Sequence, residues 1–229
     1  MKACSKRYLE KSTMTPSGRG RTDLSRRSPV RESRRLFLIL SEGDTEEDYF
    51  KHVRRRLNHP QLKIELFGET GMDPLYYVKQ AVRERDAAVR KGSAYDEVWC
   101  VFDVDQHQRL TEALDLARRK GIRVALSSPS FEIWLLWHFD SHTAHIAQVD
   151  LDRKVRRHLP GFDKRLAGYE RHLEGRSSSA IERAHELDRK HEGDRSGEGT
   201  NPSSKVHSLI DSVRDSLQRF APGSTPPYP

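Results

Sequence analysis

The sequence predicts an α/β protein with an open, mostly parallel sheet of about four strands and helices on both faces. Four short apolar segments alternate with segments of helical periodicity between residues 36 and 140. Continuous apolar runs are typical of strands buried on both faces, and strand–helix alternation is typical of parallel sheets with crossover helices. Beyond residue 140 the pattern is helical and polar, which predicts a helical C-terminal extension.

The predicted elements follow from the apolar runs and from the residues that start and stop helices. The predicted strands are 36–40, 63–68, 97–102 and 122–127. Helices are expected at 44–57, 73–91, 108–121, 128–139, 149–159, 178–192 and 201–220. The expected N-caps are Asp44, Asp73, Ser128 and Asn201. Asp44 has Glu47 at capping-box spacing, and each of the other three is followed by a proline. Gly121 is the expected C-terminal stop of the helix before it.

The net charge of +7 is concentrated at one end of the chain. Residues 1–35 contain eleven Lys/Arg and three Asp/Glu, whereas the rest of the chain contains 30 basic and 31 acidic residues. We therefore expect a disordered basic arm over 1–35, an α/β core over 36–140, a helical extension packed on it over 141–220 and a disordered tail over 221–229. The arm would attract a polyanion such as nucleic acid, or serve only solubility.

The sequence predicts a cytoplasmic protein that is not associated with a membrane. It has no apolar run of 18 residues, and its charged N-terminus lacks the apolar core of a secretory signal. The two cysteines, Cys4 in the polar arm and Cys100 in an apolar strand, favour neither a disulfide nor a zinc site.

Acidic side chains follow several of the predicted strands. Residues 97–108 read EVWCVFDVDQHQ, so Asp103 and Asp105 come directly after an apolar strand, and Glu42 follows the first strand. The segment from Ser128 to Glu132 follows the fourth strand. Ligand groups gather at the carboxyl ends of parallel strands, so these positions are expected to meet at one edge of the sheet. Each acid alone is equally consistent with a helix cap or a turn.

Together the acidic residues indicate metal-assisted phosphodiester chemistry. Asp103 and Asp105 could converge on one Mg²⁺, which prefers hard oxygen ligands, with Mn²⁺ as a substitute. Glu42 could complete the ligand set or act as general base or acid, and Gly43 would let a phosphate approach the backbone closely.

Two family resemblances rest on these motifs. A strand followed by Glu-Gly, then about sixty residues later a strand followed by Asp-x-Asp, resembles the Toprim domain, a Rossmann-type fold of topoisomerases, primases and OLD-family nucleases. More narrowly, LILSEGDTEEDYF, VWCVFDVDQH, SSPSFEIWLLWHF and NPSSKV resemble the RloB-like family, associated with prokaryotic restriction and abortive-infection loci. The resemblance covers about residues 35–220.

The resemblance implies roles for individual residues. Glu42 would be the Toprim glutamate, the general base or acid, and Asp103 and Asp105 would bind Mg²⁺. Glu132 matches the acid of the FExW element. Glu46 matches a second acidic position, although an ordinary acid of a first helical turn is the favoured explanation. One departure is Ser128 before Pro129, where family members often have asparagine, and both residues cap helices.

Other candidates have simpler explanations. His138, His142 and His145 are closely spaced but are expected to be surface histidines, and His107 is expected in a solvated turn. Lys164 and Lys205 are candidate phosphate contacts, with ordinary surface lysines as the alternative. Trp134 and Trp137, three residues apart on one predicted helix, are expected in the core.

The predicted function is therefore Mg²⁺-dependent hydrolysis of nucleic acid, in DNA or RNA and with tRNA among the candidates, as an effector of anti-phage defence. A topoisomerase or a primase would need further modules for which the chain has no room. The chain lacks a P-loop, so any ATPase would be a partner. The alternative is a latent or non-catalytic effector subunit controlled by such a partner ATPase. A phosphatase that uses the same aspartates is a weaker third hypothesis.

Overall fold

The computed structural model describes residues 34–60, 62–68, 71–104 and 109–220. Residues 1–33 of the predicted basic arm, the C-terminal tail, Asp105 and His107 lie outside these ranges, and so do the expectations about them. Arg35, the last residue of the predicted arm, is the first residue of a strand. The described residues belong to one compact unit. Within these ranges, every helix is too short or too polar to cross a bilayer.

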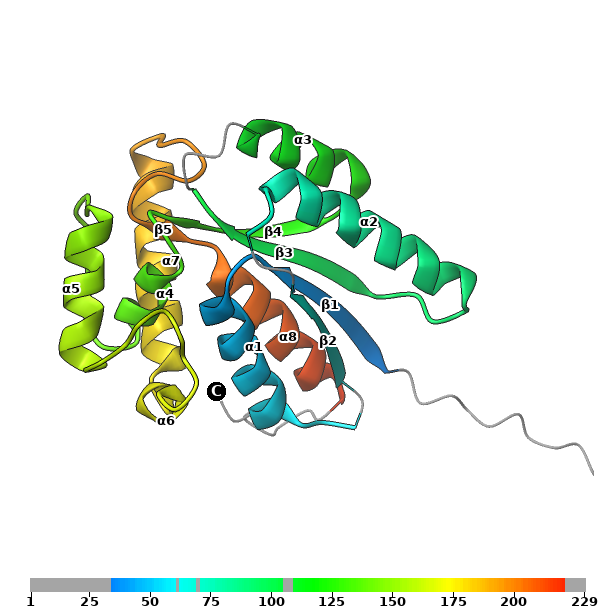
Figure 1. The fold of residues 1–229 in the computed structure, drawn as a ribbon, viewed down its shortest axis with the longest axis horizontal. Coiled ribbons are helices and arrows are strands. Elements are labelled where there is room, and N and C mark those ends of the chain that lie inside the picture. Colours follow the sequence, from blue (N-terminus) through cyan, green and yellow to red (C-terminus); the bar gives the residue numbers. More distant parts are fainter. Residues whose placement is uncertain (1–33, 61, 69–70, 105–108, 221–229) are drawn as a thin grey trace, which may run out of the picture. The chain divides into compact units, whose positions relative to one another are not determined.

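The protein has a five-stranded, mostly parallel sheet, as the sequence predicts for fold class (Figure 1). The strands are β1 (Arg35–Ser41), β2 (Leu62–Gly68), β3 (Glu97–Asp103), β4 (Arg123–Ser128) and β5 (Ser203–Ser204), in the order β2-β1-β3-β4-β5. The first four strands are parallel, and the two-residue β5, which the sequence did not predict, pairs antiparallel with β4.

Eight helices are assigned in the described residues. They are α1 (Asp44–Leu57), α2 (Pro74–Arg90), α3 (Leu110–Lys120), α4 (Glu132–Trp137), α5 (Gln148–His158), α6 (Glu170–Leu173), α7 (Ser177–Gly193) and α8 (Val206–Phe220). Helices α2 and α3 cover one face of the sheet, and α1 and α8 lie on the other (Figure 1).

The alternation of side chains along the central strands separates two apolar layers. Leu38, Cys100 and Phe102 pack with α2 and α3, whereas Ile39 and Val101, which point the opposite way, pack with α1. The second layer also receives buried residues from α4, α5, α7 and α8. The central strands are thus apolar on both faces, which explains their uninterrupted apolar sequences.

Two of the expected helix ends are correct. The Asp73 side chain accepts a hydrogen bond from the backbone N–H of Tyr76, 3.0 Å away, at the start of α2. Gly121 ends α3 with a left-handed backbone, φ 66°, which glycine adopts without the steric cost that a side chain would add.

Three expected N-caps are wrong. Gly43 is the N-cap of α1, and Asp44 is its first helical residue. Ser128 ends strand β4, so Pro129 precedes α4, which begins only at Glu132. Asn201 binds both the N–H and the carbonyl of Ile146 with its side-chain amide, at 3.0 and 2.9 Å, so its amide is used for tertiary contact and α8 begins at Val206.

Candidate functional site

The candidate site lies at the carboxyl edge of strands β1, β3 and β4, where parallel strands place their following loops together. Register pairs Ser41 of β1 with Val101 of β3, and Asp103 of β3 with Ser127 of β4. The residues after β1, those at the end of β3 and those after β4 are therefore neighbours across the sheet. This edge holds Glu42, Glu46, Asp103 and Glu132, which we call the acidic cluster.

The Glu42–Gly43 turn leads from β1 directly into α1. The buried Tyr77 hydroxyl lies 3.4 Å from the Glu42 carbonyl oxygen, to which it donates a hydrogen bond. Gly43 has an extended backbone, φ −118° and ψ 165°. A Cβ at Gly43 would lie only 2.5 Å from Glu46 Oε2, so the missing side chain makes room for that carboxylate. A phosphate that approached the Gly43 backbone closely would compete with the Glu46 carboxylate for this space. The phosphate contact at Gly43 stays a prediction.

Asp103 points to the α1 side of the sheet. Its neighbour Phe102 packs into the opposite layer with α2 and α3, and successive strand residues alternate between faces. Asp103 Oδ1 is buried and has no hydrogen-bond partner among the described residues, although the Phe131 backbone donates a hydrogen bond to the carboxylate. A buried oxygen without a partner is costly, so it is a candidate for a ligand contact.

Glu132 begins α4 and lies within the protein, with only 4% of its surface exposed. The hydroxyl of the buried Ser130 donates a hydrogen bond to Glu132 Oε2 at 2.5 Å. Aromatic side chains from α1 and α4 surround this region, with Tyr49 and Phe131 in edge contact at 5.5 Å between ring centroids. The apolar surroundings leave the carboxylate few partners other than the acidic cluster.

The carboxylates of the acidic cluster act on one another electrostatically. Burial, with smaller contributions from the negative charges of Glu132 and Glu42, raises the pKa of Glu46 from 4.5 to about 8. Burial also raises the pKa of Asp103 well above its ordinary value, with the charges of Glu46, Glu132 and Glu42 adding to the effect. Like charges that must share a desolvated volume disfavour each other's ionised forms, which a bound cation would relieve.

A loop between α5 and α6 approaches the acidic cluster from the α1 side. We call residues 162–167 the Lys164 loop. The positive charge of Lys164 lowers the pKa of Glu46, against the stronger effect of burial. The Thr45 hydroxyl donates a hydrogen bond of 2.7 Å to the Lys164 carbonyl oxygen, which joins this loop to the start of α1. Lys164 therefore lies close enough for its charge to act on Glu46, and its contact with a phosphate stays a prediction.

The chemistry of these residues fits a divalent cation only in part. Their donors are carboxylate oxygens, which Mg²⁺ prefers, and one buried oxygen of Asp103 has no protein partner among the described residues. However, within the described ranges no three His, Cys, Asp or Glu side chains converge closely enough to hold a metal ion. The predicted ligand Asp105 lies outside these ranges.

Other candidates lie in structural contacts. The ammonium of Lys205 pairs with Asp188 of α7 at 2.5 Å, and His207 Nε2 lies 3.1 Å from the same carboxylate oxygen. His138 was predicted to be a surface histidine, and this prediction is wrong. The residue is 1% exposed, and its Nδ1 lies 2.9 Å from the Trp134 carbonyl oxygen. Trp134 and Trp137 are buried in the core, as predicted.

Sequence reasoning undervalued Glu46 and missed Ser130 and Tyr77. Glu46 is only 5% exposed, so it is not an ordinary acid of a first helical turn. The available signal was the combination of Gly43 with an acid three residues later, because a glycine before a helix leaves space for that side chain. No sequence signal distinguishes Ser130 or Tyr77 from ordinary polar or aromatic core residues.

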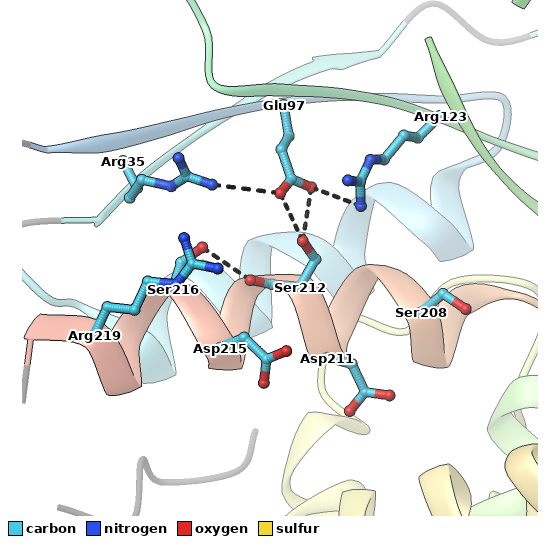
Figure 2. A pocket seen from close by; sticks show the side chains of 9 residues that line it. All are labelled: Arg35, Glu97, Arg123, Ser208, Asp211, Ser212, Asp215, Ser216 and Arg219. Carbon is cyan, nitrogen blue, oxygen red and sulfur yellow. Dashed lines mark hydrogen bonds and ion pairs between the residues drawn. The ribbon is translucent and has the colours of Figure 1, made fainter. Parts of the chain in front are cut away.

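A polar groove of about 390 Å³ lies at the opposite, amino-terminal edge of the sheet, above α8 (Figure 2). At its centre the Glu97 carboxylate accepts hydrogen bonds from Ser212 Oγ at 2.7 Å and from Trp99 Nε1 at 2.9 Å. Arg123 and Arg35 flank it at 3.3 and 3.6 Å. The hydrogen-bonding and charge requirements of the Glu97 carboxylate are thus met within the protein. This network links three strands to α8, and its role is structural.

The fold and the acidic cluster define the class: an α/β protein with a carboxylate site at the carboxyl edge of a mostly parallel sheet. Within that class, the family model described as RloB-like protein matches residues 37–213, and the chain belongs to the RloB-like protein family. The match spans β1 through most of α8 and includes all four residues of the acidic cluster. Comparison with curated proteins gives no significant match.

Proposed function

We propose that the protein is a Mg²⁺-dependent nuclease that hydrolyses phosphodiester bonds of DNA or RNA, with Mn²⁺ as a substitute metal. The observation that supports this most directly is the gathering of the acidic cluster from three strand ends, with a partly buried Asp103 that has an unsatisfied oxygen. Enclosing these acidic side chains together raises the pKa of Glu46 and of Asp103, and a cation that binds there would stabilise their ionised forms.

The Toprim resemblance is part of this proposal. Asp103 and Glu42 would hold the metal with Asp105, and the bound metal would neutralise charge that develops on the phosphate oxygens. Glu42 takes a proton from the attacking water as the water oxygen forms its bond to phosphorus. The ester P–O bond breaks, and the leaving oxygen takes up a proton. Glu132 acts on the same site through its negative charge, which raises the pKa of Glu46 and of Asp103.

The setting of this activity is also proposed. The RloB-like resemblance favours a cytoplasmic effector of prokaryotic anti-phage defence, acting on DNA, RNA or tRNA. The basic composition of residues 1–35 supports attraction to nucleic acid of any sequence.

A second function is a latent effector subunit that a partner ATPase activates. The lack of a three-ligand metal geometry within the described ranges favours it, because a partner would then have to complete the site. In this case the isolated chain would bind nucleic acid through its basic residues but would not cleave it.

The test is cleavage of plasmid, linear DNA and total tRNA with Mg²⁺, Mn²⁺ or EDTA. Asp103→Asn keeps the shape of the side chain but removes its charge, and should lower metal-dependent cleavage on the order of 100-fold. Asp215→Asn is the matched control, because Asp215 is an exposed acid on α8 that lies 3.7 Å from Arg214. Addition of Mg²⁺ should raise the melting temperature of the wild type and of Asp215→Asn, but not that of Asp103→Asn.

The outcomes separate the two functions. Equal cleavage by wild type and Asp103→Asn would falsify the assignment of the acidic cluster as the nuclease centre. If the wild type cleaves nothing with either metal, the latent-effector function replaces the nuclease.

A further inference from the structure

The Lys164 loop carries two basic residues, Lys164 and Arg165, and is joined to the start of α1 beside the acidic cluster. We propose that it forms the phosphate-binding wall of the site, and that Thr45 is a positioning residue that fixes Lys164 there. This inference rests on the proposed function for its ligand class, a phosphodiester chain.

Helix α1 holds the Lys164 loop through three separate contacts near its N-terminus. Thr45 Oγ1 donates to the Lys164 carbonyl at 2.7 Å, and Asp48 Oδ2 accepts from the Ala167 N–H at 3.2 Å. Asp44 pairs with the Arg165 guanidinium at 2.8 Å. The same turns of α1 carry Glu46, so one rigid helix positions both the Lys164 loop and a residue of the acidic cluster.

The backbone of Lys164 is held in an uncommon conformation. Its φ of 70° lies in the left-handed region, which residues with a side chain rarely adopt and which costs about 1 kcal/mol or more. The buried side chains of Phe162 and Leu166 anchor the two ends of the loop, and the buried Thr45 binds the middle. The surroundings thus determine where the exposed Lys164 side chain leaves the surface.

The charge of Lys164 remains available to a ligand. Arg165 pairs with Asp44, and the other predicted phosphate contact, Lys205, pairs with Asp188. No such ion pair involves Lys164 in the described part of the chain, yet its charge reaches Glu46. Lys164 is therefore the cation that this loop can offer beside the acidic cluster.

A polyanion that approaches the acidic cluster meets strong repulsion unless a cation lies nearby. An ammonium group fixed at the rim offsets this repulsion and binds one phosphate as a point charge. Contacts of this kind position a nucleic acid without reading its bases. The Lys164 loop should therefore contribute affinity equally for all sequences.

The experiment measures binding separately from cleavage. The full chain carrying Asp103→Asn, in EDTA, is titrated into a fluorescein-labelled single strand of about 16 nucleotides, with fluorescence anisotropy as the readout. Salt is varied from about 50 to about 200 mM. Lys164→Ala, Thr45→Val, Thr45→Ser and the double variant Thr45→Val/Lys164→Ala are compared in this background. Arg153→Ala is the control for a positive charge outside the loop that is already paired, because Arg153 on α5 lies 2.7 Å from Asp150.

Lys164→Ala should weaken binding about fivefold and reduce the slope of log Kd against log salt by about 0.7, the value for one phosphate contact on a single strand. Thr45→Val should lose part of that affinity, Thr45→Ser should restore it, and the double variant should bind no more weakly than Lys164→Ala. Arg153→Ala should have a smaller effect on the slope.

Distinct results would overturn the two parts of the inference. If the parent protein binds but Lys164→Ala leaves its salt slope unchanged, the loop is not a phosphate contact, whatever the cleavage assay gives. If Thr45→Val weakens binding equally with and without Lys164, Thr45 does not act through Lys164. A reduced salt slope in a protein that never cleaves would support the loop while the nuclease assignment fails.

Discussion

At the scale of single residues, the burial of Glu46 determines how the protein responds to pH. The pKa of Glu46 rises from 4.5 to about 8 because the carboxyl group is buried beside Glu132 and Glu42. Between these two pH values the folded protein keeps a proton that the unfolded chain releases. The free energy of unfolding therefore decreases as pH rises from about 4.5 to about 8, when no metal is bound.

Glu46→Gln should weaken this dependence. In EDTA, the variant should lose less stability than the wild type between pH 5 and 8.5, by an amount on the order of a few kcal/mol. Part of the slope should remain, because Asp103 also has a raised pKa. The measurement is urea denaturation at several pH values. The control is Glu47→Gln at the next position, where the carboxylate pairs with Lys51 at 3.0 Å, and this variant should retain the wild-type slope. An unchanged slope in Glu46→Gln would contradict the burial argument.

Three of the acidic residues could be located from the sequence because the rule that locates them is topological. Asp103 ends a strand of the parallel sheet, Glu42 and Glu132 come soon after one, and parallel strands end at the same edge. The environment of Glu46 depends on α4 and the Lys164 loop, both of which are remote in sequence. Periodicity within α1 carries no information about those contacts, so the burial of Glu46 could not be predicted from the helical pattern, and its spacing from Gly43 was the available local signal.

At the scale of elements, Glu97 connects the amino-terminal edge of the sheet to α8. Its side chain is 9% exposed and joins β1, β3, β4 and α8 through Arg35, Arg123 and Ser212 (Figure 2). The cation of Arg123 also lies over the Trp99 ring at 5.3 Å. A buried carboxylate with this many partners is far more sensitive to substitution than an exposed ion pair.

Glu97→Gln should lower the free energy of unfolding by about 2 kcal/mol, since the amide keeps the shape but leaves Arg123 without its counter-charge and Arg35 with Asp96 alone. Asp150→Asn is the control, because the Asp150–Arg153 pair on α5 is exposed and should contribute less than about 0.5 kcal/mol. Chemical denaturation of both variants tests this. Equal, small losses in the two would show that the Glu97 network adds no stability.

Element ends were predictable only where local contacts determine them. Asp73 and Gly121 satisfy backbone groups within their own helix ends, and both were predicted correctly. Asn201 binds the backbone of Ile146, and Ser128 continues strand β4. Such tertiary contacts compete with capping, and a cap-like residue in the sequence does not reveal them. The same reason explains the unpredicted β5, whose two residues depend on pairing with β4.

At the scale of the whole described unit, one apolar layer joins the sheet to the C-terminal helices. Phe37 of β1, Trp134 of α4, Leu187 of α7 and Leu209 of α8 all belong to the same buried cluster. Residues after 140 therefore bury much of the face on which the acidic cluster lies. The helical periodicity and polar composition of the residues after 140 predicted helices. The burial of these helices in the same layer as β1 could not be predicted, because it depends on contacts between segments far apart in the chain.

Because the core is shared, we expect residues 34–220 to unfold in one cooperative transition. Leu209→Ala, at a fully buried position on α8, should lower the free energy of unfolding by about 3 kcal/mol through loss of burial and formation of a cavity. Tryptophan fluorescence, which reports on buried Trp99, Trp134 and Trp137, should shift to the same lower midpoint as far-UV circular dichroism. Val149→Ala, where the valine is 69% exposed, should change stability by less than about 0.5 kcal/mol. If Leu209→Ala instead separates the two signals, α8 unfolds before the sheet, and the acidic cluster would survive without the C-terminal helices.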